Sequence, residues 1–420
     1  MEYIKRYENG LRLVVKEIPG MLSVATGIYV NVGSGDESGQ INGISHFTEH
    51  MLFKGTKKRT AFEISDSIDR IGAQINAFTS KECTCYYTKS TADHAEDTAE
   101  ILSDLFFNST FLEKEIKREK GVVLEEIAMV EDTPDELCAE LISEAYFNGH
   151  ALGRTILGKS GVVSAFSREN LTNHLAEYYN SSNVVIALAG KITFEEAQKL
   201  VDKYFLNNFI QGNACQKPAS HLAKKLYNKK IKETEQANIC ISFPSVPLDD
   251  ENSNAYLLLN GILGGGMSSR LFQKIREKKG LAYSVYSYIS SYLNNGMLTV
   301  YSGVNPANTD EAVKYIKEEF EVFKTKGITK EEFQRGKEQL KSSLIFGQEN
   351  VTSLMNAYGK YLLLTDKMFS IDKKFKDISD LSFDKVNSLC YNMFDFDKIC
   401  AAYVGKEEFS LNLGSILSID

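Results

Sequence analysis

The spacing of hydrophobic residues divides the first half of the chain into short strands and amphipathic helices. Asn9-Gly10 is a signal for a type I′ hairpin turn, which places a strand over residues 11–16 directly after it. Alternating apolar positions predict further strands over residues 22–32, 73–79, 83–90 and 183–189. Helical spacing predicts helices over residues 43–53, 61–71, 95–107, 114–130, 136–145, 168–178 and 194–205.

A polar segment over residues 207–230 separates the two halves. It contains Gly212 and Pro218 and shows no strong periodicity, so we interpret it as a linker. The second half then shows strands over residues 237–243, 283–292, 296–303 and 399–404, and helices over residues 255–263, 269–279, 311–325 and 330–346. We therefore predict an N-terminal domain over residues 1–210, a linker over 211–230 and a C-terminal domain over 231–420.

The order and spacing of elements match between the halves, which indicates a distant duplication. In the first half, a strand over residues 85–90 leads to a helix from Ala95 and then to residues 111–116. In the second half, a strand over 298–303 leads in the same way to a helix from Asp310 and then to residues 328–333. Antiparallel strands mixed with runs of helices predict an α+β fold rather than a doubly wound parallel sheet.

Composition narrows the class of protein. The chain has 420 residues, of which 43% are hydrophobic and 25% charged, as is typical of soluble globular proteins. Its 48 basic and 56 acidic residues give a formal net charge of −8, which argues against a nucleic-acid partner. The sequence shows neither a signal peptide at its start nor an apolar run typical of a membrane helix. With an odd count of seven cysteines, we expect reduced thiols and a cytoplasmic protein without a membrane partner.

The pentad His46-Phe47-Thr48-Glu49-His50 carries the most specific chemical signal. In a helix, His46 and His50 lie one turn apart on the same face, so both imidazoles can reach one cation. Neutral imidazole is a good zinc ligand, and zinc lowers the pKa of a water molecule that it binds towards about 7. Glu49 lies on the same flank and could take a proton from that water. The alternative is an amphipathic helix with two incidental surface histidines.

A catalytic zinc site usually has three protein ligands, so a third must come from elsewhere in the chain. The helix over residues 114–130 offers Glu119 and Glu126, which are seven residues apart and therefore share a face. Apolar residues border this face, and a carboxylate in such a place needs a partner such as a cation. The alternative is a solvated acidic face, since further acids lie nearby: Glu113, Glu115, Glu125 and Glu131.

Other metal-binding residue types carry weaker signals. Cys83 and Cys85 would lie on one face of a strand. At such positions, buried thiols with a structural role are more common than cysteines that supply half of the ligands of a soft metal. The remaining histidines are more typical of surface or packing positions than of ligands: His94, His150, His174 and His221.

The order His-x-x-Glu-His resembles that of the inverzincins, the family of pitrilysin, insulin-degrading enzyme and mitochondrial processing peptidase. Four segments carry the resemblance: residues 9–13, 46–56, 72–79 and 119–127. Together with the second half, the resemblance covers essentially the whole chain. It implies two duplicated α/β-roll domains that form half of a clamshell. It also implies a zinc-dependent endopeptidase that hydrolyses oligopeptides or unfolded peptide extensions.

The resemblance also implies roles for individual residues. His46, His50 and Glu126 would bind Zn²⁺, and Glu119 would be a second carboxylate that orients a ligand. Glu125 is the rival for the third ligand, but the spacing of seven from Glu119 favours Glu126. Glu49 would be the general base. Substrate peptide would add as a strand beside four residues, Asn76, Ala77, Phe78 and Thr79.

The second half lacks His-x-x-Glu-His, as in the metal-free half of this family. Arg276 and Tyr283 resemble the family's pair that contacts substrate and stabilises the tetrahedral intermediate; the alternative is a basic helix end followed by a strand tyrosine. The family's long members hold four such domains, so this chain implies a homodimer or a heterodimer with a related subunit. Two other classes remain open, a catalytically inactive scaffold or binding subunit and a protein with purely structural zinc.

Overall fold

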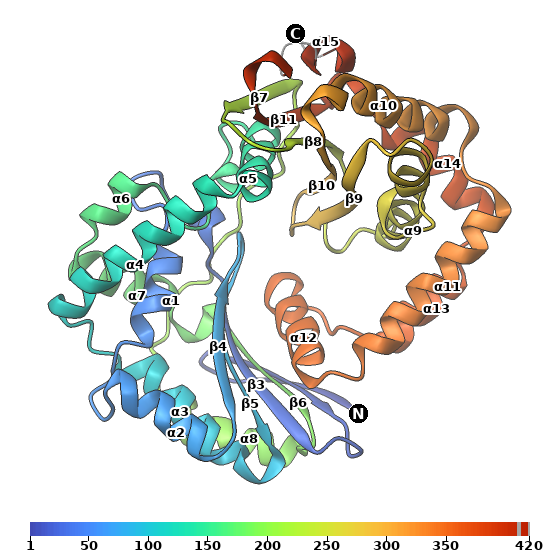
Figure 1. The fold of residues 1–420 in the computed structure, drawn as a ribbon. Helices are drawn as coiled ribbons and strands as arrows, with labels where there is room; N and C mark the ends of the chain where they lie inside the picture. The colour runs from blue at the N-terminus through green and yellow to red at the C-terminus, as the bar shows by residue number, and fades with distance from the viewer. Residues whose placement is uncertain (410–412, 419–420) are drawn as a thin grey trace. The chain divides into compact units, whose positions relative to one another are not determined.

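The computed structural model describes residues 1–409 and 413–418, which form two compact units (Figure 1). Unit 1 comprises Met1–Ile127, Arg154–Lys217 and Phe346–Phe369. Unit 2 comprises Ala128–Gly153, Pro218–Ile345 and Ser370–Asp420. Each unit holds one mostly antiparallel sheet covered by helices, which confirms the predicted α+β class.

The sheet of unit 1 has six strands in the order β1-β2-β6-β3-β5-β4. Its strands are β1 (Glu2–Arg6), β2 (Arg12–Glu17), β3 (Ser23–Val30), β4 (Gln74–Thr79), β5 (Thr84–Thr91) and β6 (Val184–Gly190). Strands β2 and β6 are parallel, and the other neighbours are antiparallel. Strand β4 therefore forms one edge of this sheet.

The sheet of unit 2 has five strands in the order β7-β11-β8-β10-β9. Its strands are β7 (Leu226–Ile231), β8 (Ala237–Pro244), β9 (Ala282–Ser291), β10 (Gly296–Val304) and β11 (Cys400–Gly405). Strands β7 and β11 are parallel and the others antiparallel, which repeats the pattern of β2-β6-β3-β5-β4 strand for strand. A shared topology of this kind is what an internal duplication predicts.

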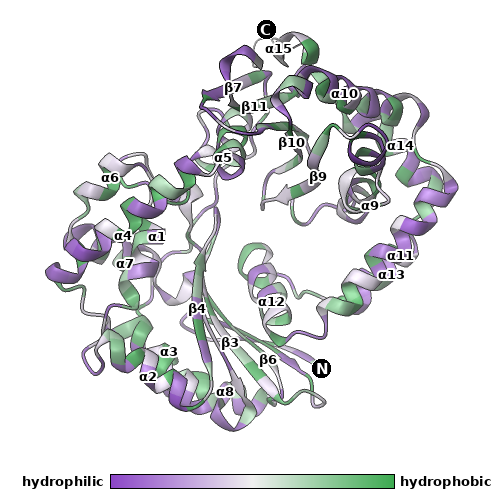
Figure 2. Cartoon of the chain, viewed as in Figure 1, coloured by the Kyte–Doolittle hydropathy of each residue, from purple (hydrophilic) through white to green (hydrophobic). Residues whose placement is uncertain are grey.

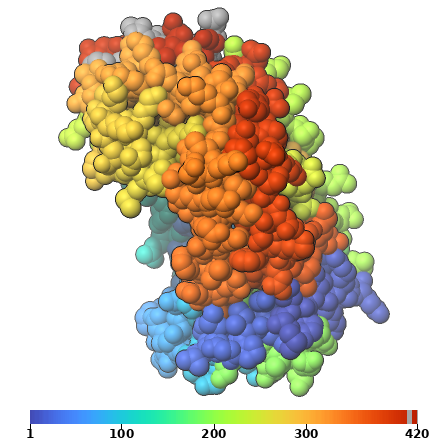
Figure 3. All heavy atoms as spheres, turned by 90° about the vertical axis from the view of Figure 1, so that its right-hand side faces the viewer, coloured from blue at the N-terminus to red at the C-terminus, as the bar shows by residue number. Residues whose placement is uncertain are grey.

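Helices cover both sheets. Those of unit 1 are α1 (Ile44–Leu52), α2 (Ala61–Arg70), α3 (Ala95–Asn108), α4 (Glu113–Asp132, in this unit up to Ile127), α6 (Ser160–Ala165), α7 (Arg168–Tyr178), α8 (Phe194–Tyr204) and α12 (Val351–Thr365). Those of unit 2 are α5 (Pro134–Tyr146), α9 (Ser253–Gly264), α10 (Thr309–Lys326), α11 (Lys330–Gly347, in this unit up to Ile345), α13 (Ile371–Ser379), α14 (Phe383–Met393) and α15 (Leu413–Leu417). Hydrophilic and hydrophobic residues alternate along α4 and α11 (Figure 2). Helices α11 and α13 lie at the surface drawn in Figure 3. Lys337 of α11 donates a hydrogen bond to the carbonyl oxygen of Ser379, the last residue of α13.

Each unit contains one helix from the other half of the sequence. Helix α5 precedes the polar segment 207–230, yet it packs on β11, β8 and β7 in unit 2. Helix α12 follows that segment, yet it packs on β3, β6 and β2 in unit 1. Both sheets thus receive a covering helix that is distant in sequence.

Two glycines allow α12 to approach β3 closely. A Cβ atom on Gly359 of α12 would lie 2.3 Å from Cε2 of Tyr29, and one on Gly27 of β3 would lie 2.9 Å from Sδ of Met355. The Tyr29 hydroxyl donates to Oδ1 of Asn356 at 2.5 Å. Seven of the eight residues of β3 are buried, because α12 covers one face and the main core of unit 1 covers the other.

The predicted hairpin at Asn9-Gly10 forms, but its turn differs from the predicted type. Only Gly10 of the pair has a positive φ, of 92°, whereas a type I′ turn needs two such residues. The Gly10 N–H donates to Tyr7 O and the Tyr7 N–H to Leu11 O, which gives a three-residue loop. Asn9 instead uses its side-chain oxygen to accept the N–H of Leu11 at 3.1 Å.

Two other segments also differ in detail from the sequence-based prediction. The last part of the predicted linker forms β7, the edge strand of the second sheet, with Lys229 and Lys230 exposed. Charged residues on an edge strand discourage pairing with a further strand. They also obscure the alternation of polar and apolar residues from which a strand is predicted. The helix predicted over residues 269–279 is mostly a π-helix, over Phe272–Lys278. Within the described residues, none of the helices has the length and apolar character that spanning a membrane requires.

The close contact between α12 and β3 predicts the effect of a single methyl group. Gly359→Ala should lower the free energy of unfolding by about 1–2 kcal/mol, because overpacking against Tyr29 outweighs the gain in helix propensity. Gly261→Ala is the matched control: it also lies inside a helix, but its Cβ would meet nothing within 4 Å. Urea titration should show the control to be as stable as the wild type or more stable. Equal stability of the two variants would contradict the packing argument.

Candidate metal centre

A buried carboxylate from outside the helix fixes the start of α1, the helix that carries the pentad. Gly43 precedes α1 with a φ of 98° and offers no side chain to cap it. The carboxylate of Glu37 accepts the N–H groups of Gly43 at 2.7 Å and Ser45 at 2.8 Å. A Cβ on Gly43 would lie 2.5 Å from the carbonyl oxygen of Leu157, so glycine is required there. The first turn of α1 is therefore held by tertiary contacts.

The amphipathic character of α1 sets which side chains face the site. Ile44, Phe47 and Met51 are buried in the core of unit 1. The imidazoles of His46 and His50 lie on the opposite flank and are 13% and 19% exposed. The predicted juxtaposition of the two rings one turn apart is present, with centroids 4.5 Å apart.

Helix α4 supplies the carboxylates. Its buried residues Ile116, Glu119, Val123 and Ile127 follow the helical repeat, so Glu119 lies within an otherwise apolar stripe. Glu126 stands beside that stripe, with its side chain 32% exposed. The expected placement of both carboxylates at the border of the core is thus observed.

Three of these side chains converge. Glu126 Oε2 lies 3.8 Å from His46 Nε2 and 3.6 Å from His50 Nε2. One ligand atom from each of the three residues lies within 4.8 Å of the others, and this is the one such group of His, Cys, Asp or Glu found among the described residues. Bonds of about 2.1 Å at tetrahedral angles separate two ligand atoms by about 3.4 Å. The three side chains therefore fit zinc with a small adjustment.

Glu119 contacts Nδ1 of His50, the ring nitrogen that does not face Glu126. Its Oε1 lies 2.8 Å from Nδ1 of His50, and its Oε2 lies 2.8 Å from Nζ of Lys54. The Glu119 side chain is only 2% exposed. If Nδ1 of His50 carries the proton, Nε2 is left with its lone pair towards Glu126, which is the arrangement a metal ligand needs.

Glu49 reaches from α1 to the edge strand. Its Oε2 accepts a hydrogen bond from the hydroxyl of Thr79 at 2.5 Å, at the end of β4. Burial raises the pKa of Glu49, although the bond from Thr79 and the nearby His50 work against this rise. A carboxylate with a raised pKa and one oxygen held in place is suited to accept and return a proton.

The two histidines have opposite pKa shifts. Burial and the nearby His50 lower the pKa of His46 to about 4, so its imidazole is neutral near pH 7. Burial also acts to lower the pKa of His50, but the hydrogen bond to Glu119 and the charges of Glu126 and Glu49 outweigh it and raise the pKa. Three carboxylates around two imidazoles make this a site that favours a cation.

Strand β4 contains the four residues predicted to bind peptide. Asn76, Ala77, Phe78 and Thr79 pair with residues of β5 on one side, and β4 is the last strand of the sheet on the other. Helix α1 contacts β4 within unit 1. An extended segment that added to this edge would therefore run beside the helix that carries Glu49.

Arg276 and Tyr283 lie together in unit 2. The Arg276 guanidinium is 5.3 Å from the ring centroid of Tyr283 and 4.9 Å from that of Phe272. The π-helix supplies Arg276 and Phe272, whereas Tyr283 lies on β9 and is 73% exposed. The Arg/Tyr pair predicted from the sequence is thus formed within one unit.

The remaining sequence candidates do not join the centre. Glu125 is exposed and lies outside the group of three. Cys83 and Cys85 are buried free thiols, and burial raises the pKa of both. The other histidines have different surroundings: His94 bonds Asp97, His150 the carbonyl of Ala219, His221 that of Tyr146, and His174 is buried beside Tyr178 and Tyr179. A surface pocket of about 770 Å³ in unit 1, lined by the first turn of α3 and along α8, contains none of the three converging residues.

Sequence reasoning gave no role to Lys54 or Glu37. The sequence around Lys54 gives no sign of its partner, because α1 ends at Leu52 and Glu119 lies on another helix. Glu37 could have been sought because α1 begins at a glycine and has no capping side chain of its own. Neither residue could be connected to its partner from the sequence, because both contacts depend on the fold.

Comparisons with known proteins match most of the chain. The family described as Insulinase (Peptidase family M16) matches residues 12–160, and that described as Peptidase M16 inactive domain matches residues 165–340. The chain is 44% identical over 398 residues to the uncharacterized zinc protease YmxG of Bacillus subtilis, which covers 94% of this chain and 96% of that protein. It is 35% identical over 392 residues to an uncharacterized zinc protease of Streptomyces coelicolor, covering 91% and 84% of the two chains.

Solved structures share the fold. A protease from Helicobacter pylori matches with a TM-score of 0.90 and 21% identity, covering 96% of this chain and 99% of that chain. A chain of Complex III2 from Candida albicans matches with a TM-score of 0.85 and 19% identity, covering 99% of both chains. At these identities the likeness concerns the fold alone.

The raised pKa of His50 predicts how zinc affinity depends on pH. Below that pKa, His50 is an imidazolium without a free lone pair, so the affinity for Zn²⁺ should fall by up to about tenfold per pH unit. Competition with a chromophoric chelator from about pH 8 to about pH 5.5 measures this dependence. In Glu119→Gln, the fall should begin at a lower pH, because the hydrogen bond that raises the pKa loses its charge. A pH-independent affinity would contradict the assignment of His50 as a ligand.

Proposed function

Because the chain belongs to peptidase family M16, we propose that it is a zinc-dependent endopeptidase that hydrolyses oligopeptides or unfolded peptide extensions. The observation that carries this proposal is the convergence of His46, His50 and Glu126 in unit 1. This donor set, with two imidazoles and one carboxylate, is typical of catalytic zinc sites that retain an open coordination position. Zinc held there would supply Lewis acidity, which polarises a carbonyl group and makes hydroxide available near neutral pH.

Glu49 is the general base in this proposal. It takes a proton from the attacking water and later delivers it to the nitrogen of the leaving amine. The hydroxyl of Thr79 holds one carboxylate oxygen of Glu49, which leaves the other free to handle the proton. Glu119 orients His50 through its hydrogen bond to Nδ1.

The free edge of β4 is the proposed substrate-binding strand. Main-chain hydrogen bonds along such an edge give affinity without a strong demand on sequence. Peptide docked along residues 76–79 would place its backbone next to α1, and thus near Glu49. This arrangement favours extended peptides over folded proteins, because a folded chain has few segments free to add as a strand.

The proposal includes a second subunit, identical or related. Arg276 and Tyr283 are suited to contact a substrate carbonyl and to donate to a developing oxyanion. We assign them to the substrate bound at the metal centre of the partner subunit. The cytoplasmic location predicted from the sequence stays a prediction.

An inactive scaffold and a structural zinc site are the alternatives. A scaffold has no chemical need for a proton-accepting Glu49 hydrogen-bonded beside three converging ligands. A structural zinc site usually closes with four protein ligands, whereas the group found among the described residues has three. Both observations favour the hydrolase.

Glu49→Gln should separate metal binding from turnover. The variant should bind one Zn²⁺ like the wild type, because Glu49 is outside the group of three, but kcat should fall by about 10²–10⁴-fold or more. Glu125→Gln, an exposed glutamate of α4, is the matched control and should keep both properties. Metal analysis and cleavage of a peptide library provide the two measurements. Full activity in Glu49→Gln would refute the assigned role.

A mixing experiment tests whether the active site is shared between subunits. Glu49→Gln and Arg276→Gln should each be inactive alone, yet random exchange in a homodimer should restore about one quarter of the wild-type activity, since half of the dimers are mixed and each has one intact site. Exchange is followed by mass labelling of one variant. No recovery after demonstrated exchange would contradict a shared site.

A further inference from the structure

The loop after α1 brings a lysine to the back of the metal centre. The Lys54 N–H donates to the carbonyl of Met51 at 3.2 Å, and Gly55 then turns the chain with a φ of 114°. From this turn the Lys54 side chain reaches Glu119 on α4, with Nζ 2.8 Å from Oε2. The lysine side chain is 31% exposed, whereas the Glu119 side chain is 2% exposed.

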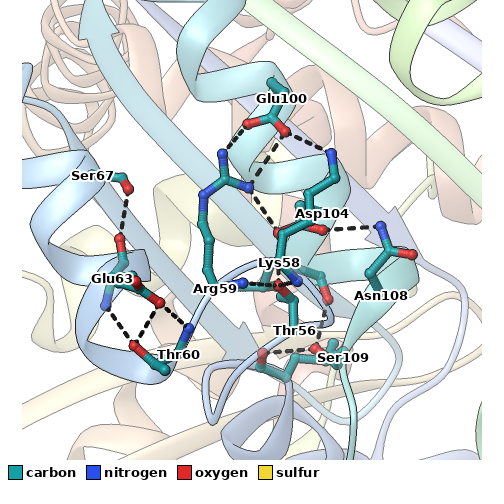
Figure 4. Close-up of polar contacts among 12 residues, drawn as sticks. Thr56, Lys58, Arg59, Thr60, Glu63, Ser67, Glu100, Asp104, Asn108 and Ser109 are labelled. Atoms are coloured by element: carbon teal, nitrogen blue, oxygen red, sulfur yellow. Dashed lines mark hydrogen bonds and ion pairs between the residues drawn. The ribbon is translucent and has the colours of Figure 1, made fainter.

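A polar network anchors this loop on α3 (Figure 4). Arg59 donates to Glu100 at 2.5 Å and to Asp104 at 2.7 Å, and Thr56 donates to the same oxygen of Asp104 at 2.7 Å. Asp104 is itself 2% exposed, so its charge depends on these partners. Backbone bonds add to the network, from Lys57 N to Asn108 O and from Thr110 N to Gly55 O. The position of Lys54 is therefore fixed from both sides of the loop.

Each oxygen of the Glu119 carboxylate has one partner. Oε1 faces Nδ1 of His50 and Oε2 faces Nζ of Lys54, both at 2.8 Å. A buried carboxylate bound on one oxygen alone can turn about its last bond, and it also lacks the charge compensation that burial demands. With Lys54 in place, the carboxylate plane is fixed and Oε1 stays directed at His50.

We infer that Lys54 is a positioning residue for the metal ligand His50 and that it acts through Glu119. Lys54 fixes the carboxylate, the carboxylate fixes the tautomer and the ring orientation of His50, and Nε2 is thereby presented to the metal. The inference rests on the proposed function, since it assumes that the centre binds zinc. A substrate-binding role for the lysine head group is the competing explanation.

Zinc affinity of the full-length protein tests the inference, with Zn²⁺ as the probe and a chromophoric chelator as the competitor. Lys54→Met should raise the dissociation constant about 10–100-fold, as expected for the loss of a group that supports a ligand. Lys54→Arg should recover most of the affinity, because it restores a cation at the same place. Lys58→Met is the matched control, since Lys58 lies in the same loop and pairs with Glu100 at the surface.

A double-mutant cycle shows whether the effect passes through Glu119. Lys54→Met should have no further effect on zinc affinity in a Glu119→Gln background. Circular dichroism and thermal unfolding verify that each variant is folded. With saturating zinc, KM for a peptide should be unchanged in Lys54→Met; a rise in KM without a change in zinc affinity would show a substrate contact and overturn the inference.

The failure of the inference can be distinguished from the failure of the proposed function. If the wild type binds no zinc, the proposed function falls and the role of Lys54 falls with it. If the wild type binds zinc and folded Lys54→Met binds it equally well, only the role of Lys54 is overturned. Additive effects of Lys54→Met and Glu119→Gln would likewise overturn the route through Glu119.

Discussion

The centre depends on one buried charge, the carboxylate of Glu119 in the apolar stripe of α4. A carboxylate that is 2% exposed must be compensated, and both of its partners come from the end of α1 and the loop behind it. Meeting this requirement fixes how α1 is rotated against α4. Once that rotation is fixed, the imidazoles of His46 and His50 face Glu126, and Glu49 faces the edge strand.

The charges around the centre are suited to a cation. Glu49, Glu119 and Glu126 surround two imidazoles, one of which is held neutral by burial. Hydrogen bonds to His50 and Lys54 outweigh the effect of burial and lower the pKa of Glu119. Glu126 stays the more exposed of the α4 pair and faces both Nε2 atoms. The three carboxylates therefore differ in their contacts and in their burial.

The duplicated halves share a five-stranded pattern, to which β1 is added in the first sheet, but the candidate functional residues differ between them. The edge strand β4 of the first sheet borders the helix with the metal motif. The edge strand β9 of the second sheet instead carries Tyr283 beside Arg276, and residues 231–420 contain no second His-x-x-Glu-His. The match of residues 165–340 to a domain described as inactive agrees with this division. One architecture thus supports a unit with the His-x-x-Glu-His motif and a unit without it.

Most elements, the α+β class with two sheets and the pentad on α1 could be predicted from the sequence, because periodicity and helical spacing are properties of neighbouring residues. The family was predicted from the resemblance of four segments. The helix predicted over residues 168–178 has the observed bounds of α7. The tertiary structure alone shows that α5 and α12 pack on the sheet of the other half, and it brings Glu126, which the spacing already favoured over Glu125, close to the imidazoles. It also decided the partners of Lys54 and Glu37. Apart from the bonds of Glu37 to nearby Gly43 and Ser45, these contacts join residues far apart in sequence. They depend on how the whole fold buries its apolar surfaces and compensates its charges.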